Sequence, residues 1–100
     1  MSKKISNLNE LEDFLNQKKV FDFFGISRMG VFGSFARGEQ ANDIDLLVKG
    51  AELNKKGLAR FLFGLEQDAG TKIDFVLEEY ADPIVLSRAQ KDLRYVRKRK

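Results

Sequence analysis

Two aspartates, Asp43 and Asp45, follow a short turn of small residues and are the groups in this chain best suited to chemistry. Because Ile44 and Leu46 alternate with them, we expect a strand that carries both carboxylates on one face, roughly 7 Å apart. Two like charges at that separation repel unless a cation lies between them, and Mg²⁺ prefers carboxylate oxygens as ligands. The pattern therefore predicts a magnesium site.

The turn before these aspartates contains Gly33 and Ser34, which are suited to binding phosphate. Glycine lets backbone N–H groups approach a ligand closely, and the serine hydroxyl can donate to a phosphate oxygen. If Ser34 opens a short helix, the free N–H groups there also favour an anion. Phosphate donors beside a metal pair indicate a nucleoside triphosphate, whereas either piece alone could be an ordinary turn or an exposed acidic strand face.

Together these residues resemble the minimal nucleotidyltransferases of the DNA polymerase β superfamily, whose hallmark is Gly-Ser, a loop, and Asp-x-Asp flanked by aliphatic residues. The segment 72–76, Lys-Ile-Asp-Phe-Val, resembles the family's third strand with its single carboxylate, Asp74. The resemblance covers roughly residues 20–97. Eight residues separate Ser34 from Asp43, which is fewer than is usual in the family.

The resemblance implies a nucleotidyltransferase fold and a two-metal reaction. Asp43, Asp45 and Asp74 would hold two Mg²⁺ ions, and an acceptor hydroxyl would attack the α-phosphorus of ATP and take AMP. Asp74 could also accept the proton of that hydroxyl. As a strand-edge charge, Asp74 could instead pair with Lys72 or Lys49.

The resemblance also assigns Gly33 and Ser34 to the β and γ phosphates of the nucleotide. Arg37 is a further candidate for binding these phosphates, since its guanidinium suits bidentate contact. The alternative for Arg37 is an ordinary solvated loop arginine.

The partner is also implied by resemblance, because small members of this family are often encoded beside a HEPN-domain ribonuclease toxin. They act as its antitoxin by transferring AMP to a tyrosine or by forming a complex. A HEPN-domain toxin is therefore the expected partner, and a homo-oligomer is also allowed. One alternative is a catalytically silent binding module, in which the short loop has altered the triphosphate site. A nucleic-acid-binding domain that uses the basic run at residues 97–100 is the least favoured reading.

Local patterns predict the elements that must position these residues. Their alternation predicts an α/β fold, with a small mixed sheet of about three strands flanked by helices. The expected elements are a helix from about residue 7 to 18 with Asn7 and Glu10 as a capping box, an aromatic cluster at 20–24, strands at 28–32, 43–48 and 72–77, a helix from about 53 to 69 capped by Gly70, and a last helix from Pro83 through about Arg97 with Asp82 as its N-cap.

The composition limits the classes of protein and of chemistry. A chain of 100 residues is expected to form one domain, 1–100, with a basic tail from about residue 97. Neither cysteine nor histidine is present, which excludes disulfides, thiolate catalysis and typical zinc sites. The net charge of +3 arises at the end of the chain, and the tail is expected to be a last helical turn frayed into solvent. Neither a signal peptide nor a membrane span is apparent, so a cytoplasmic protein is expected.

Overall fold

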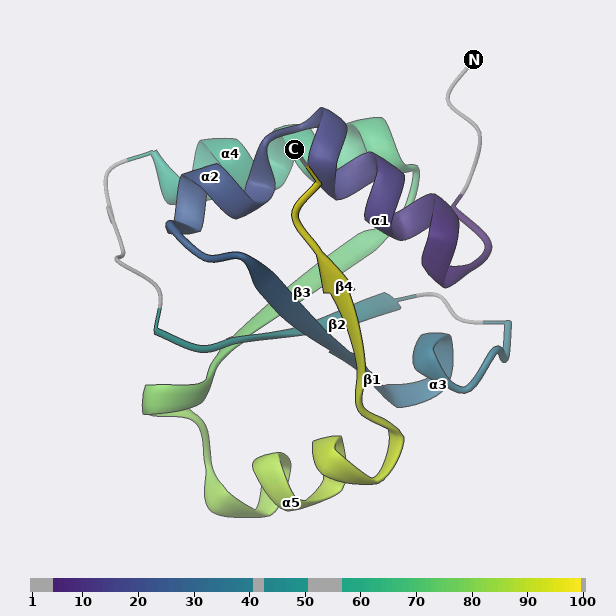
Figure 1. Cartoon of the computed structure of the whole chain (residues 1–100), viewed down its shortest axis with the longest axis vertical. Coiled ribbons are helices and arrows are strands. Elements are labelled where there is room, and N and C mark those ends of the chain that lie inside the picture. The colour runs from purple at the N-terminus through teal and green to yellow at the C-terminus, as the bar shows by residue number, and fades with distance from the viewer. Residues whose placement is uncertain (1–4, 41–42, 51–56, 100) are drawn as a thin grey trace.

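A mixed sheet of four strands, in the order β3-β2-β1-β4, runs through the middle of the protein (Figure 1). Strand β1 (Arg28–Phe32) pairs antiparallel with both β2 (Asp43–Val48) and β4 (Arg94–Arg97). Strand β2 pairs parallel with β3 (Lys72–Leu77). This computed structural model describes residues 5–40, 43–50 and 57–99, and the predicted start of a helix near residue 53 lies outside them.

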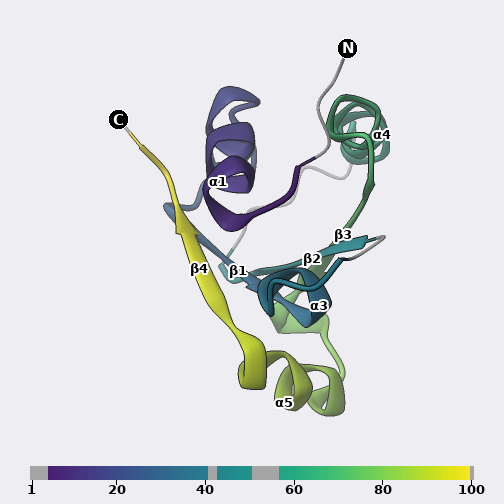
Figure 2. The same cartoon turned by 90° about the vertical axis from the view of Figure 1, so that its right-hand side faces the viewer.

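Helices cover the two faces of the sheet unequally (Figure 2). One face carries α1 (Leu8–Gln17), α2 (Val20–Phe24) and α4 (Leu58–Ala69), and the opposite face carries α5 (Pro83–Asp92). The short helix α3 (Gly33–Ala36) follows β1 directly, and a 3-10 turn, η1 (Glu78–Tyr80), follows β3. None of the helices within the described ranges combines the length and apolar character needed to pass through a bilayer.

The core lies between the sheet and the helices α1, α2 and α4. Phe21 and Phe24, from the predicted aromatic cluster at 20–24, are each 1% exposed, so these rings pack in the core. Strands and helices both supply fully buried aliphatic side chains, namely Leu11, Leu15, Val20, Met29, Val31, Ile44, Leu46, Val48 and Val96. Because alternate strand residues are used for this packing, the remaining ones must point to the opposite face of the sheet.

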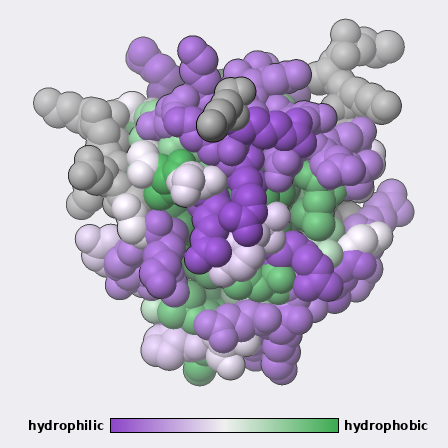
Figure 3. Space-filling model, in the orientation of Figure 1, coloured by the Kyte–Doolittle hydropathy of each residue, from purple (hydrophilic) through white to green (hydrophobic). Residues whose placement is uncertain are grey.

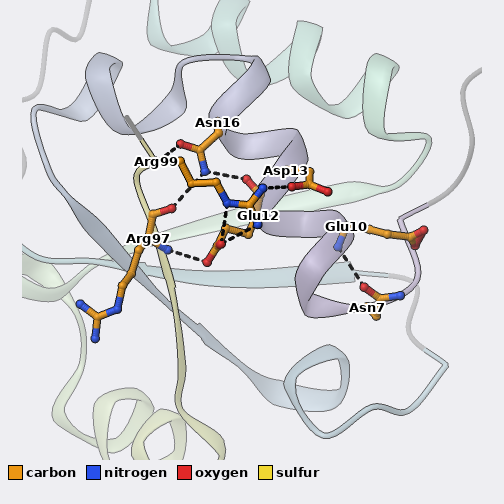
Figure 4. Close-up of polar contacts among 7 residues, drawn as sticks. All are labelled: Asn7, Glu10, Glu12, Asp13, Asn16, Arg97 and Arg99. Carbon is orange, nitrogen blue, oxygen red and sulfur yellow. Dashed lines mark hydrogen bonds and ion pairs between the residues drawn. The ribbon is translucent and has the colours of Figure 1, made fainter.

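Predicted caps fix the ends of three helices. The side chain of Asn7 accepts a hydrogen bond from the backbone N–H of Glu10 at 2.9 Å (Figure 4). Asp82 caps α5 in the same manner, with its carboxylate 2.8 Å from the N–H of Ile84. Gly70 ends α4 in a left-handed conformation with φ of 69°. The three predicted caps are confirmed, whereas the carboxylate of Glu10 accepts from the N–H of Ser6 at 2.8 Å, one residue before the N-cap that a capping box uses.

The last helix ends earlier than predicted. Leu93 adopts an extended conformation, with ψ of 126°, and the next residues form β4 instead of a continued helix. The prediction of a helix through Arg97 is therefore wrong, as is the count of about three strands. Pairing with β1 places Val96 opposite Met29 and leaves Val96 only 1% exposed, and this burial outweighs the local preference for helix.

Side chains of α1 cover the outer edge of β4 (Figure 4). Glu12 accepts from the backbone N–H of Arg97 at 3.0 Å, and the amide of Asn16 donates to the carbonyl of Arg97 at 3.0 Å. The same amide accepts from the N–H of Arg99 at 2.7 Å, so Asn16 contacts the chain as a neighbouring strand would. An edge that could pair with another chain is thereby protected.

Ion pairs hold the basic tail against the same region. Arg99 pairs with Glu12 and Asp13 on α1, and Lys98 pairs with Asp22 on α2. The tail is therefore an extended, docked segment, and the expectation of a frayed helical turn is wrong. The acidic side chains that pair with the tail are exposed or half-buried. They lie outside the apolar pattern that predicts the helices, so this pattern could not indicate their pairing with the tail.

Candidate functional site

The three predicted carboxylates lie on one face of the sheet. In the parallel pairing of β2 and β3, Asp45 stands opposite Asp74, and Asp43 precedes it by two residues. Ile44 and Leu46 point into the core, so the aspartates between them point away from it. All three carboxylates are half-buried. The tertiary structure thus brings Asp74 beside a pair of aspartates nearly 30 residues earlier in the chain.

The Gly33–Ser34 turn lies against this group. Gly33 has a φ of +78°, and a Cβ built on it would be 2.7 Å from Oδ2 of Asp45. Glycine is therefore required here both for backbone conformation and for space. The first turn of α3 begins at Gly33, so the predicted opening of a short helix at this position is confirmed. The turn and Asp45 form one continuous site.

Burial and like charges raise the pKa of Asp45. Desolvation is the largest cause, and the neighbouring carboxylates of Asp74 and Asp43 add to it, whereas Lys72 opposes it. The Nζ atom of Lys72 lies 3.9 Å from Oδ1 of Asp74, so the alternative partner predicted for Asp74 is also present. A cation placed among these carboxylates would offset the same repulsion that raises the pKa of Asp45.

The donor set fits a hard divalent cation, because it consists of carboxylates beside a serine hydroxyl. Among the residues that the structure describes, no group of three or more acidic side chains lies close enough together to hold an ion as they stand. Binding an ion would therefore draw these carboxylates toward one another. The strand register already pairs Asp45 with Asp74, so these two side chains start from adjacent positions.

Arg37 lies at the C-terminal end of α3 and is held by two carboxylates. Its Nε donates to Oε2 of Glu39 at 2.5 Å, and its Nη1 donates to Oδ2 of Asp92 at 2.7 Å. These hydrogen bonds keep the pKa of Arg37 well above its usual range. The structure therefore places Arg37 next to the turn but engaged with protein groups, and phosphate binding by Arg37 stays a prediction.

Asp92 is a residue of this region that sequence reasoning missed. It ends α5, and its contact with Arg37 joins the only helix on this face, among the described residues, to the Gly33–Ser34 turn. The two residues are 55 positions apart, so no local pattern could have paired them.

Comparison with known proteins identifies the family. Residues 8–96 match the profile of the nucleotidyltransferase domain. The chain belongs to the nucleotidyltransferase family. A relative of this nucleotidyltransferase in Methanocaldococcus jannaschii, provisionally named a protein adenylyltransferase, is 32% identical, over 92% of this chain and 100% of the relative. The protein adenylyltransferase MntA of Thermococcus cleftensis is 30% identical, over 89% of this chain and 95% of MntA.

Solved structures share the fold of this nucleotidyltransferase. A toxin–antitoxin crystal structure with AMP-PNP superimposes with a TM-score of 0.69 and 17% identity, over 89% of this chain and 74% of the other. A complex of a tri-AMPylated HEPN toxin with an MNT antitoxin from Shewanella oneidensis gives a TM-score of 0.58 and 18% identity, over 85% of this chain and 71% of the other. The expected nucleotidyltransferase fold is confirmed.

Proposed function

We propose that this nucleotidyltransferase transfers AMP from ATP, with Mg²⁺, to a hydroxyl on a HEPN-domain partner, and that it thereby acts as an antitoxin. The observation that carries this proposal is the position of Asp45, which lies between Asp74 on the neighbouring strand and the Gly33 turn. The names of the relatives support AMP as the transferred group. The AMPylated HEPN toxin in a structurally similar complex supports the class of partner.

Each predicted residue has a distinct task in this reaction. Asp43 and Asp45 would hold both Mg²⁺ ions, and Asp74 would complete the site for the second. When bound, the ions would supply charge stabilisation to the attacking and leaving oxygens of an in-line displacement at the α-phosphorus. Asp74 accepts the proton of the acceptor hydroxyl as its oxygen bonds to phosphorus. The bond to the β-phosphate breaks, and pyrophosphate leaves.

The turn would hold the leaving group. The backbone N–H groups at the start of α3 and the hydroxyl of Ser34 would bind the β and γ phosphates. For Arg37 to join them, its guanidinium would exchange Glu39 or Asp92 for a phosphate oxygen, an exchange of one charge-assisted hydrogen bond for another.

The first test is calorimetric binding of Mg²⁺ with a non-hydrolysable ATP analogue. We expect metal-dependent binding by the wild type and its loss in an Asp43→Asn, Asp45→Asn double variant. Asp68→Asn is the matched control, because Asp68 lies on α4 and pairs only with Lys18 among the ion pairs found. Equal binding by the wild type and the double variant would contradict the proposed site.

A second candidate function is a binding module that neutralises its partner without chemistry. It is favoured by the engagement of Arg37 with Glu39 and Asp92, and by the separation of the acidic side chains noted above. Co-expression of a HEPN-domain partner with the double variant separates the two candidates. A transferase loses its protective effect and leaves the partner without an AMP adduct in mass spectrometry, whereas a binding module still protects.

A further inference from the structure

A cavity of about 470 Å³ lies between α5 and the sheet. Its lining includes Leu47 from β2, Lys49 just after that strand, Arg28 from the start of β1, Tyr95 from β4 and Gln90 from α5. The volume falls within the range typical of small-molecule sites. None of these residues belongs to the carboxylate group or to the Gly33–Ser34 turn, so the cavity is a second feature of the same region.

The strand register places this cavity on the same face as the carboxylates. Along β2, Asp45 and Leu47 share one face, so Leu47 lies about 7 Å beyond Asp45, and Lys49 follows the strand directly. Gly30 stands opposite Leu47 on β1, and Tyr95 stands opposite Gly30 on β4. Leu47, Gly30 and Tyr95 therefore form a row across three strands. This row lies next to the position of Asp45 along the sheet, and its residues line the cavity.

The direction from the turn to the cavity matches the shape of a nucleotide. The Gly33–Ser34 turn lies at the C-terminal end of β1, whereas the cavity reaches Arg28 at the other end of that strand. With phosphates at the turn and the α-phosphorus at Asp45, the nucleoside extends along the sheet away from α3. On that path lie Leu47 and Gly30, on which Leu93 packs, and all three of these residues line the cavity.

The lining suits a planar heterocycle that has hydrogen-bonding edges. The guanidinium of Arg28 lies 4.4 Å from the centre of the Tyr95 ring, and the residue Tyr95 is 47% exposed. A base can stack on either of these planar groups. The amide of Gln90 and the carboxylate of Glu78 supply donor and acceptor groups for the edges of the ring.

The end of α5 closes the cavity on one side. A Cβ on Gly30 would be 2.7 Å from Cδ1 of Leu93, so glycine allows Leu93 to pack directly onto the sheet. The walls are the faces of strands and a helix, and the free edge of β4 is covered by α1. An extended acceptor peptide would therefore find no strand edge to pair with in the cavity, whereas a base needs none.

We propose that this cavity binds the base of the donor nucleotide, with Tyr95 and Arg28 stacking on the ring and Gln90 contacting its edge. The inference rests on the proposed transferase function, because the position of the triphosphate sets the direction of the nucleoside. Tyr95 and Gln90 are then the residues that distinguish ATP from a bare triphosphate.

The test compares Mg·ATP with Mg·tripolyphosphate by NMR of the ¹⁵N-labelled full chain. We expect both ligands to shift the amide signals of Gly33 and Ser34, and only Mg·ATP to shift those of Gly30, Lys49 and Tyr95. Shifts at the turn with both ligands, and none at the cavity, would overturn the base site and leave the proposed function standing. Absence of shifts at the turn with either ligand would overturn both proposals. Cavity shifts that appear only on adding a HEPN-domain partner would assign the cavity to the acceptor and overturn the base site.

Two variants with matched controls make the same test quantitative. Tyr95→Ala is expected to raise the Kd for Mg·ATP about tenfold, because one stacking contact is lost, and to leave the Kd for Mg·tripolyphosphate unchanged. Tyr80→Ala, at a tyrosine that is 82% exposed on η1 outside the cavity, should change neither. Gln90→Ala is compared with Gln67→Ala on α4 in the same way. Equal ATP affinity in Tyr95→Ala, Gln90→Ala and the controls, each with a wild-type-like spectrum, would contradict the base site.

Discussion

At the scale of the single residue, stability and function oppose each other at Asp45. Burial and the carboxylates of Asp74 and Asp43 raise its pKa, so its ionised form is disfavoured in the folded state without a cation. Stability from this group is present below the ordinary pKa of 3.8 and is lost as pH rises through the raised value. Such a conflict is typical of functional sites.

We therefore expect Asp45→Asn to raise the free energy of unfolding at pH 7 by about 0.5–2 kcal/mol while binding of Mg·ATP is lost. The difference from the wild type should shrink as pH falls through the raised pKa of Asp45. Urea denaturation over a pH series from 7 into acid measures the change in stability, and calorimetry measures binding of Mg·ATP, with Asp68→Asn as the control for both. A variant less stable than the wild type at pH 7 would contradict this account.

Gly33 allows a second prediction at the same scale. In Gly33→Ala a methyl group meets Oδ2 of Asp45, and alanine must also adopt a φ of +78°. Gly38→Ala imposes nearly the same backbone strain, since its φ is +80°, but its methyl group has nothing within 4 Å. We expect Gly38→Ala to cost about 1 kcal/mol and Gly33→Ala at least that much more. Thermal unfolding of the two variants isolates the contact with Asp45, and equal losses would show that it is unimportant.

At the scale of the element, β4 depends on α1 for its outer edge. The hydrogen bond from the backbone N–H of Arg97 is the largest cause of the lowered pKa of Glu12, and the Arg99 side chain lowers it further. A lowered carboxyl pKa contributes stability above the ordinary value of 4.5, and that contribution is lost as pH falls through the lowered value. Docking of β4 on α1 should therefore weaken in acid.

Glu12→Ala is expected to lower the free energy of unfolding by about 1–2 kcal/mol at pH 7, because a backbone donor loses its partner. The difference should diminish as pH falls through the lowered pKa of Glu12. Asp13→Ala is the control on the same helix and should cost less than about 0.5 kcal/mol, because the ion pair that Asp13 makes with Arg99 is exposed. Equal losses of unfolding free energy in the two variants would show that the hydrogen bond from the Arg97 N–H to Glu12 does not stabilise the fold.

At the scale of the whole molecule, two cations of the basic tail are paired with acidic side chains of the same protein. Lys98 and Arg99 pair with acidic residues of α1 and α2, although the chain has a net charge of +3. The face in Figure 3 is largely hydrophilic, with apolar patches between the polar groups. The tail therefore contributes to the fold, and this use competes with binding of nucleic acid.

Removal of residues 98–100 is expected to lower the melting temperature by several degrees, since ion pairs and the backbone bonds of Lys98 to Ser27 and of Arg99 to Asn16 are lost. We also expect the intact protein to bind duplex DNA only weakly. Differential scanning calorimetry and a salt titration of DNA binding measure the two effects. Tight, strongly salt-dependent binding that the truncation abolishes would instead favour the nucleic-acid reading.

The sequence by itself determined the features that depend on neighbours a few residues apart. The alternation of Asp43 to Leu46, the Gly33–Ser34 turn, and the caps at Asn7, Gly70 and Asp82 are confirmed as structure. Each follows from side-chain direction or from backbone preference within one turn or strand, and no distant partner is needed.

Only the tertiary structure decided which distant segments meet. It placed Asp74 opposite Asp45, joined Arg37 to Asp92, turned residues 94–97 into an edge strand, and enclosed the cavity beneath α5. The residues that pair in this way are separated by long stretches of chain. Strand pairing and burial of apolar surface stabilise these contacts enough to offset the entropy lost in closing long loops. A local sequence pattern carries no information about that balance.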